Sequence, residues 1–227
     1  TMSRFPSTLS WLNGLQAQGV SIINSPQSIA LCNSRASLTR LMLSNNLPMP
    51  RTILLPPSTL HPSPSTQYPC WLKRGDASAQ SEGDVVFCSD EAQLRAHLQD
   101  FARRGITACV VSQHVEGDLV KFYGVRGTGF FRCFYPTDDG QSKFGDEHHN
   151  GTARHYAFDE ERMYAGVEHL ATLTAVDVYG GDCIIRPDGT YCIIDFNDWP
   201  SFAPCRSEAA PHIAKTLLAL AKAHTNN

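Results

Sequence analysis

The feature that most constrains the fold of this chain is a pair of apolar runs, 178–186 and 190–196, that surround Asp188-Gly189. An Asp-Gly pair between two such runs is typical of a β-hairpin with a two-residue turn. Successive side chains of a strand alternate between two faces, so the register of the hairpin decides which residues meet. The sequence therefore predicts an antiparallel hairpin here.

In the register set by that turn, Asp182 lies directly opposite Asp195, and Asn197 follows two residues later on the same face. Carboxylates about 5 Å apart on paired strands repel each other unless a cation lies between them. Carboxylate and amide oxygens are ligands suited to Mg²⁺. We therefore predict a metal site at these three residues. The alternative is that both acids end their strands in solvent, and a bulge in either strand would change the register.

The composition excludes several classes of protein. The 227 residues carry a formal net charge of −3, which is not that of a generally basic nucleic-acid-binding protein. No run approaches the roughly 20 apolar residues that a membrane helix needs. The eight cysteines form no CxxC pair, and most lie beside apolar runs. This pattern favours buried thiols in a reducing compartment, so we expect a cytoplasmic protein without a nucleic-acid or membrane partner.

Strand patterns occur in clusters that are interrupted by helical patterns, which predicts an α+β fold with two antiparallel sheets. A short helix over 9–17 and a strand over 20–23 resemble the remnant of a preceding domain, because they bury little by themselves. The other predicted helices span 34–45, 89–104, 159–175 and 208–223, and the other predicted strands span 52–55, 70–73, 84–88, 109–112, 119–125, 130–135, 178–186 and 190–196.

Lys73 ends an apolar strand and precedes a loop of small and polar residues, 75–83. Such a loop can direct backbone N–H groups toward phosphates while the lysine supplies a point charge. The loop lacks the GxxxxGK[ST] pattern, which excludes a P-loop. A lysine at the end of a strand is also commonly just solvated, so this signal is weak by itself.

A second hairpin is predicted around Gly127-Thr128, with Lys121 and Arg132 as diagonal neighbours on one face. Two cations in this arrangement repel each other unless an anion such as a phosphate or a carboxylate bridges them. Two extended side chains on an exposed sheet are an equally good interpretation. The adjacent His148-His149 lies in a polar loop and gives no sign of a metal site, since adjacent side chains point apart.

The order of these elements resembles the ATP-grasp superfamily over roughly residues 20–220. The resemblance depends on a strand that ends in Lys73, the segment 113–118, and the motif of Asp182, Asp195 and Asn197 followed by Pro200. It is strongest for the branch with the ribosomal-protein glutamate ligases and the inositol-trisphosphate kinases. The resemblance implies two α+β subdomains with antiparallel sheets that clamp ATP, over 28–112 and 113–227, after an N-terminal remnant at 1–27.

The resemblance also implies roles for individual residues. Lys73 would contact the α- and β-phosphates, the backbone of 113–115 would bind adenine, and the metal motif would hold Mg²⁺ or Mn²⁺. Arg35 stands where the family usually has a lysine, and His114 stands where an acid is usual. The predicted nucleotide-binding residues are Lys73, Arg35, Gln113, His114, Val115 and Asp118, the last near the ribose. Lys121 and Arg132 would face the γ-phosphate and the acceptor.

The function implied is an ATP- and Mg²⁺-dependent ligase that joins a carboxylate to an amine through an acyl phosphate. One alternative is a kinase that phosphorylates a polyol or a phosphorylated small molecule. Another is a nucleotide-binding module without catalysis. The family's N-terminal domain commonly helps to bind the acceptor, and the resemblance leaves only the remnant at 1–27 of that domain. The acceptor would be a small molecule or a peptide; neither its identity nor the oligomeric state follows from the sequence.

Overall fold

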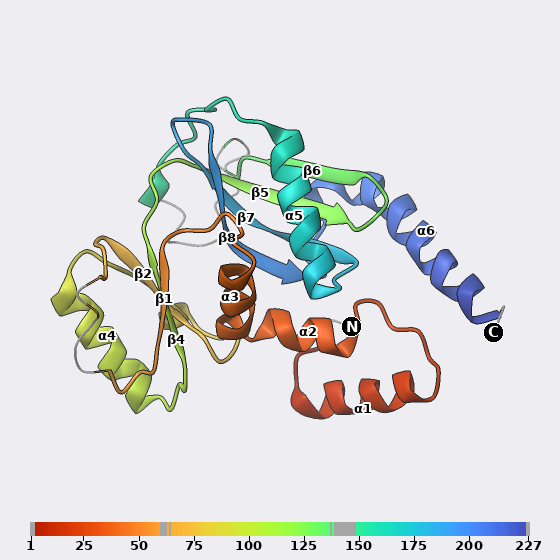
Figure 1. The fold of residues 1–227 in the computed structure, drawn as a ribbon, viewed down its shortest axis with the longest axis horizontal. Coiled ribbons are helices and arrows are strands. Elements are labelled where there is room, and N and C mark those ends of the chain that lie inside the picture. Colours follow the sequence, from red (N-terminus) through yellow and green to blue (C-terminus); the bar gives the residue numbers. More distant parts are fainter. Residues whose placement is uncertain (1–2, 60–62, 64, 137, 139–148, 226–227) are drawn as a thin grey trace.

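The structure is a computed structural model that describes residues 3–59, 63, 65–136, 138 and 149–225 (Figure 1). A small sheet has the strand order β1-β4-β2-β3 and a large sheet has the order β6-β5-β7-β8, all antiparallel. This arrangement confirms the predicted α+β class. The elements are α1 (Pro6–Ala17), α2 (Pro26–Asn33), α3 (Arg35–Ser44), β1 (Thr52–Leu55), β2 (Cys70–Arg74), β3 (Val85–Cys88), α4 (Glu91–Arg103), β4 (Cys109–Gln113), β5 (Asp118–Val125), β6 (Phe130–Phe134), α5 (Glu160–Thr174), β7 (Val178–Ile185), β8 (Tyr191–Asp198) and α6 (Arg206–Thr225).

The small sheet is covered on one face by α4, as Figure 1 shows. The helix begins after Asp90, whose side chain accepts a hydrogen bond from the backbone N–H of Gln93. Leu94, Leu98 and Phe101 lie on one side of α4 and are fully buried against the sheet. Since Leu72 of β2 belongs to the same cluster, its neighbours Trp71 and Lys73 lie on the opposite face, turned away from α4.

The large sheet packs its inner face on α5. Met163, Val167 and Leu170 of this helix are fully buried in one cluster with Phe122 of β5 and Ile193 of β8. The same cluster includes apolar side chains of α2 and α3, so these helices pack on the large sheet although they precede the small one in sequence. The other face of the large sheet is covered at one end by α6.

The strand predicted over 20–23 is wrong, since these residues have no ladder partner among the described strands. The side chain of Asn24 instead joins the segment to the start of β7. Its amide donates to the carbonyl of Val178 at 2.8 Å and accepts from the N–H groups of Asp177 and Val178 at 2.7 and 2.9 Å. The buried side chain of Asn24 thus satisfies backbone groups at the start of β7, which a strand at 20–23 could have paired instead.

The two hairpins of the large sheet have different loops from those predicted. The β5–β6 register is confirmed, with Lys121 opposite Phe134, but the ladder closes at Val125 and Phe130, so 126–129 form the loop. In the β7–β8 hairpin, Arg186 donates its backbone N–H to Thr190 at 2.8 Å, so the loop is 187–189. Its last residue is a glycine with φ of 78°. The predicted two-residue turn is therefore wrong by one residue.

Candidate functional site

A β-bulge in β8 shapes the candidate site. Cys183 pairs with Ile193, whereas the adjacent Asp182 pairs with Asp195, so Ile194 is an extra residue without an opposite partner. The extra residue compensates for the longer loop. The predicted opposition of the two aspartates is therefore found in the structure, although the regular register from which it was derived is not.

The two aspartates continue a row across the sheet that includes Lys121, because Lys121 pairs with Asp182 and Asp182 with Asp195. The Lys121 ammonium donates to Asp182 Oδ1 at 3.2 Å. On the other acid, Asp195 Oδ2 accepts from the side-chain amide of Asn197 at 2.7 Å, which places Asn197 on the predicted face. Each carboxylate thus has a neighbour that offsets part of the repulsion between them.

The chemistry of these donors fits a divalent cation. Two carboxylates and one amide oxygen on one face are hard oxygen ligands of the kind that Mg²⁺ takes together with water and phosphate oxygens. Within the described ranges, no group of three His, Cys, Asp or Glu side chains could hold a metal ion, so a cation here would be held by the two carboxylates with the Asn197 amide, water or phosphate oxygens as further ligands. The metal roles of Asp182, Asp195 and Asn197 stay a prediction.

Lys73 reaches from the small sheet to this row. Its ammonium donates to the carbonyl of Ile194 at 3.1 Å, the residue that the bulge leaves out of the ladder. Burial, and next the nearby Arg35, lower the pKa of Lys73 to about 8, while Asp195 and Asp182 act in the opposite direction. A half-buried cation from one sheet therefore lies beside the carboxylates of the other.

Arg35 is the first residue of α3 and contacts the last residue of β2, the strand that carries Lys73. Its guanidinium donates through Nη1 to the carbonyl of Arg74 at 2.7 Å, and the next residue, Ala36, donates its N–H to the carbonyl of Gly75 at 2.8 Å. These bonds fix the start of α3 against the start of the 75–83 loop. The structure thus brings Arg35 close to Lys73 and to the predicted phosphate loop.

The predicted adenine-binding segment is the connection between the two sheets. Gln113 ends β4, and the N–H of His114 donates to the carbonyl of Pro69 at 2.9 Å. The side-chain amide of Asn150 donates to the carbonyls of Val115 and Gly117 at 2.9 and 3.1 Å. The connection is thereby held from both sides, and its binding of a base stays a prediction.

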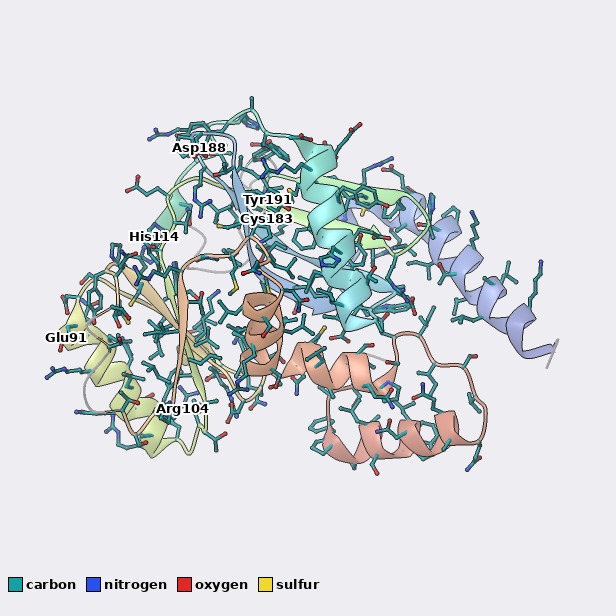
Figure 2. The ribbon with its side chains drawn as sticks, viewed as in Figure 1. Glu91, Arg104, His114, Cys183, Asp188 and Tyr191 are labelled. Atoms are coloured by element: carbon teal, nitrogen blue, oxygen red, sulfur yellow. The ribbon has the colours of Figure 1, made fainter. Side chains whose placement is uncertain are left out.

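Aromatic rings lie around His114, a group that the sequence analysis missed. The Trp71 indole donates to His114 Nδ1 at 3.1 Å, and Phe87 lies opposite Trp71 on β3. The His149 ring stacks on Phe87 with centroids 4.1 Å apart, and Figure 2 places His114 at the junction between the sheets. Burial, and next the neighbouring His149, lower the pKa of His114. Pairing the strands predicted over 70–73 and 84–88 could have indicated the opposition of Trp71 and Phe87, but no sequence signal indicated the position of His149. His148 lies outside the described residues.

Asp118 has a different environment from the one expected for a ribose ligand. It is 2% exposed, and its carboxylate oxygens accept from the backbone N–H groups of Arg154 and Tyr156 at 2.7 and 2.9 Å. These bonds anchor the segment before α5 to the start of β5. The ribose contact stays a prediction, and the observed bonds do not favour it.

Among the described residues, Arg132 and Lys121 pair with different acids. Its Nε donates to Glu208 of α6 at 2.7 Å, and both side chains are 49% exposed, whereas Lys121 pairs with Asp182. The diagonal repulsion predicted from the register is relieved by two separate acids. Of the two predicted catalytic cations, the structure brings only Lys121 to the carboxylate row.

The described part of the chain includes no helix long and apolar enough to cross a membrane. No protein-family model matches the sequence, and no curated protein is similar to it. The fold, in contrast, is similar to many solved structures.

Three solved structures illustrate the similarity. D-Alanine–D-alanine ligase from Bacillus anthracis, as a complex with ATP, has a TM-score of 0.67 and 11% identity, covering 96% of this chain and 76% of that one. A RimK-domain ATP-grasp protein from Sphaerobacter thermophilus DSM 20745 has a TM-score of 0.68 and 18% identity, with 94% and 77% covered. L-Amino acid ligase from Bacillus licheniformis has a TM-score of 0.59 and 15% identity, with 82% and 45% covered.

Proposed function

The chain has the ATP-grasp fold, and on this premise we propose that it is an ATP- and Mg²⁺-dependent ligase that joins a carboxylate to an amine. The observation that carries the proposal is the approach of Lys73, from the small sheet, to the Lys121–Asp182–Asp195 row of the large sheet. The solved structures of similar fold that are named as ligases support it.

The proposed reaction has two steps. A carboxylate oxygen of the first substrate attacks the γ-phosphorus of ATP, and ADP leaves with the bridging oxygen. The amine of the second substrate then attacks the acyl carbon, loses a proton, and displaces inorganic phosphate. Negative charge builds on the bridging oxygen of ADP in the first step and is spread over the oxygens of the transferring group, so fixed positive charge near them lowers the barrier.

The residues of this chain would divide that task. Lys73 would neutralise the α- and β-phosphates. Arg35 would add a second positive charge beside it, held in position by its hydrogen bond to the carbonyl of Arg74. Lys121 would face the γ-phosphate once Asp182 turns to a cation. Asp182, Asp195 and Asn197 would hold Mg²⁺, which when bound supplies further charge neutralisation.

The first experiment measures thermal unfolding with Mg²⁺ plus ADP, with each alone, and with neither. A ligand at about a hundred times its dissociation constant adds roughly 2.7 kcal/mol to the free energy of unfolding, which raises the midpoint by several degrees for a chain of this size. We expect a shift that needs both components. A shift with ADP that is independent of Mg²⁺ would contradict the metal site, and no shift would contradict the proposal as a whole.

A matched pair of variants on one hairpin sharpens this experiment. Asp195→Asn keeps the shape of the side chain but removes its charge, and we expect Mg²⁺-dependent ADP affinity to fall at least about tenfold. Asp188→Asn removes a carboxylate at the hairpin tip, labelled in Figure 2, where it accepts from the Thr190 N–H at 2.9 Å. This control should leave the affinity unchanged. Equal effects of the two would refute the role of Asp195.

The reaction type is tested by the products. A ligase releases free phosphate from ATP only when a carboxylate and an amine are both present, whereas a kinase transfers the phosphate to the acceptor. We expect phosphate release with mixtures of amino acids or short peptides, and none with polyols. ADP formation without free phosphate would favour the kinase, and tight nucleotide binding without turnover in any mixture would favour a binding module.

A further inference from the structure

Arg4, in the segment before α1, connects both subdomains. Its Nη2 donates to Asp198 Oδ1 at 2.9 Å, at the end of β8 in the large sheet. Its Nη1 donates to Ser78 Oγ at 2.9 Å, in the loop that follows Lys73 of the small sheet. One guanidinium therefore joins three segments that are remote in sequence, and its planar, multiple donors suit such a bridge.

Ser78 lies at the tip of that loop, between two anchored ends. At the start, Gly75 donates its N–H to the carbonyl of Ala108 at 2.8 Å. At the end, the buried carboxylate of Asp84 accepts from the N–H of Gln80 at 2.7 Å. Ala77 is buried, but the small side chains of the half-buried Ser78 and the exposed Ala79 give the tip itself little packing.

Two side chains hold the tip from different directions. The Asn33 side-chain oxygen, at the end of α2, accepts from the Ser78 N–H at 3.3 Å and from Ser78 Oγ at 2.8 Å. Arg4 donates to the same hydroxyl. The hydroxyl thus serves as donor to Asn33 and acceptor from Arg4, which uses both of its capacities and fixes its orientation.

The ion pair with the buried carboxylate of Asp198 holds the Arg4 side chain in place. This residue directly follows Asn197 in the chain and is 3% exposed, so its carboxylate needs a partner in the folded protein. The side chain of Arg4 is 29% exposed, so one side of the guanidinium contacts solvent while the other is held.

We infer that Arg4 is a positioning residue that latches the loop tip at Ser78 to the carboxylate strand β8, and so holds the loop over the phosphates of the bound nucleotide. The inference rests on the proposed nucleotide site. The latch joins the loop after Lys73 to the strand that carries Asp195 and Asn197, and these are the two sides between which a nucleotide would lie.

The test compares nucleotide binding with the mobility of the loop. Arg4→Ala and Arg4→Lys are compared with the unaltered chain and with Arg103→Ala, a control whose ion pair with Asp100 is surface-exposed. For each protein, the affinities for ADP with Mg²⁺ and for adenosine are measured, together with amide hydrogen exchange in peptides that cover 75–83.

In Arg4→Ala we expect faster exchange in 75–83 and about tenfold weaker binding of ADP, the loss typical of a hydrogen bond to a charged group, with adenosine affinity unchanged within about twofold. Arg4→Lys keeps a charge beside Asp198 but cannot contact both acceptors. The thermal midpoint of each variant is measured as well. We expect Arg4→Lys to have a midpoint close to that of the unaltered chain, while its ADP binding remains as weak as in Arg4→Ala. A merely structural ion pair would not separate the two properties in this way. Arg103→Ala should change neither property.

Two results would overturn the inference. Unchanged exchange in 75–83 of Arg4→Ala would show that the latch does not hold the loop, whatever the ligand. Equal losses of ADP and adenosine affinity would show that Arg4 acts on stability and not on the phosphates. If the unaltered chain binds no ADP, the proposed function fails and the phosphate role fails with it, while the exchange data still decide whether the latch exists.

Discussion

The two hairpins of the large sheet, β5–β6 and β7–β8, both have polar loops but differ in the regularity of their ladders. The β5–β6 ladder is regular from Lys121 to Val125. The β7–β8 ladder has a bulge at Ile194, and two glycines, Gly180 and Gly181, lie in β7 beside it. The candidate site lies on the irregular hairpin. A bulge commonly occurs next to a site, because it frees a backbone group and redirects side chains.

The difference teaches that the bulge gives the irregular hairpin a hydrogen bond to the small sheet. The carbonyl of Ile194, left out of the ladder, accepts from Lys73 of the small sheet. Gly181 lets the neighbouring strands approach, since a Cβ there would lie 2.2 Å from the Asp195 carbonyl oxygen and 2.5 Å from Phe122 Cζ. In the β5–β6 loop, a Cβ on Gly127 would meet nothing within 4 Å.

The largest effect that tests this comparison is on stability. We expect Gly181→Ala to lower the free energy of unfolding by about 3 kcal/mol or more, because backbone atoms of β8 must shift. Gly127→Ala meets no atoms but has φ of 72°, so it should cost only about 1 kcal/mol. Urea denaturation of both variants measures the two values. Similar losses would mean that the close approach of β7 and β8 is not a constraint.

Much of the fold follows from local signals in the sequence. Asp90 and Asp159 cap α4 and α5 at the starts of the helices predicted over 89–104 and 159–175, and apolar runs predicted the strands of both sheets. Irregular backbone was not predictable. The three-residue loop and the bulge at Ile194 each shift the register by one, and they cancel, so the aspartates met for a reason that pattern analysis could not supply.

Contacts between remote segments were equally inaccessible. Arg4 and Asp198 are 194 positions apart, and neither stands in a pattern that indicates the other. Asp118 shows the same limit, because the family resemblance implied a ribose contact whereas its two carboxylate oxygens accept from backbone N–H groups of a later segment. The alternation along the strands predicted which polar side chains share a face of the sheet, but tertiary packing decided what those side chains bind.

An intermediate effect concerns the pH dependence of the subdomain contact. Lys73 has a pKa of about 8 in the folded chain against an ordinary value of 10.5, so between these values the unfolded chain binds more protons. Its contribution to the free energy of unfolding therefore rises with pH from about 8 to about 10.5, by up to about 1.4 kcal/mol per pH unit.

The measurement is the difference in unfolding free energy between the unaltered chain and Lys73→Met, at pH 7.5 and pH 9.5. We expect the unaltered chain to gain about 1 kcal/mol or more relative to the variant over this interval, since other titrating groups are common to both and cancel. A constant difference would show that Lys73 is not desolvated by the contact with β8, and would remove the connection that distinguishes the two hairpins.

The smallest effect tests the bulge itself. Deletion of Ile194 leaves Ile193 opposite Cys183 and brings Asp195 next to it, still opposite Asp182, so the ladder becomes regular and the side chains keep their faces. Lys73 loses its carbonyl acceptor, worth about 1 kcal/mol, and we expect about fivefold weaker ADP binding with Mg²⁺ dependence retained.

Ile194→Ala keeps the carbonyl and removes only the side chain, so its affinity should stay near that of the unaltered chain. If the two variants bind alike, the bulge does not serve Lys73; if the deletion abolishes Mg²⁺ dependence, the bulge sets the carboxylate geometry instead, and the irregular hairpin would then act within the large sheet alone.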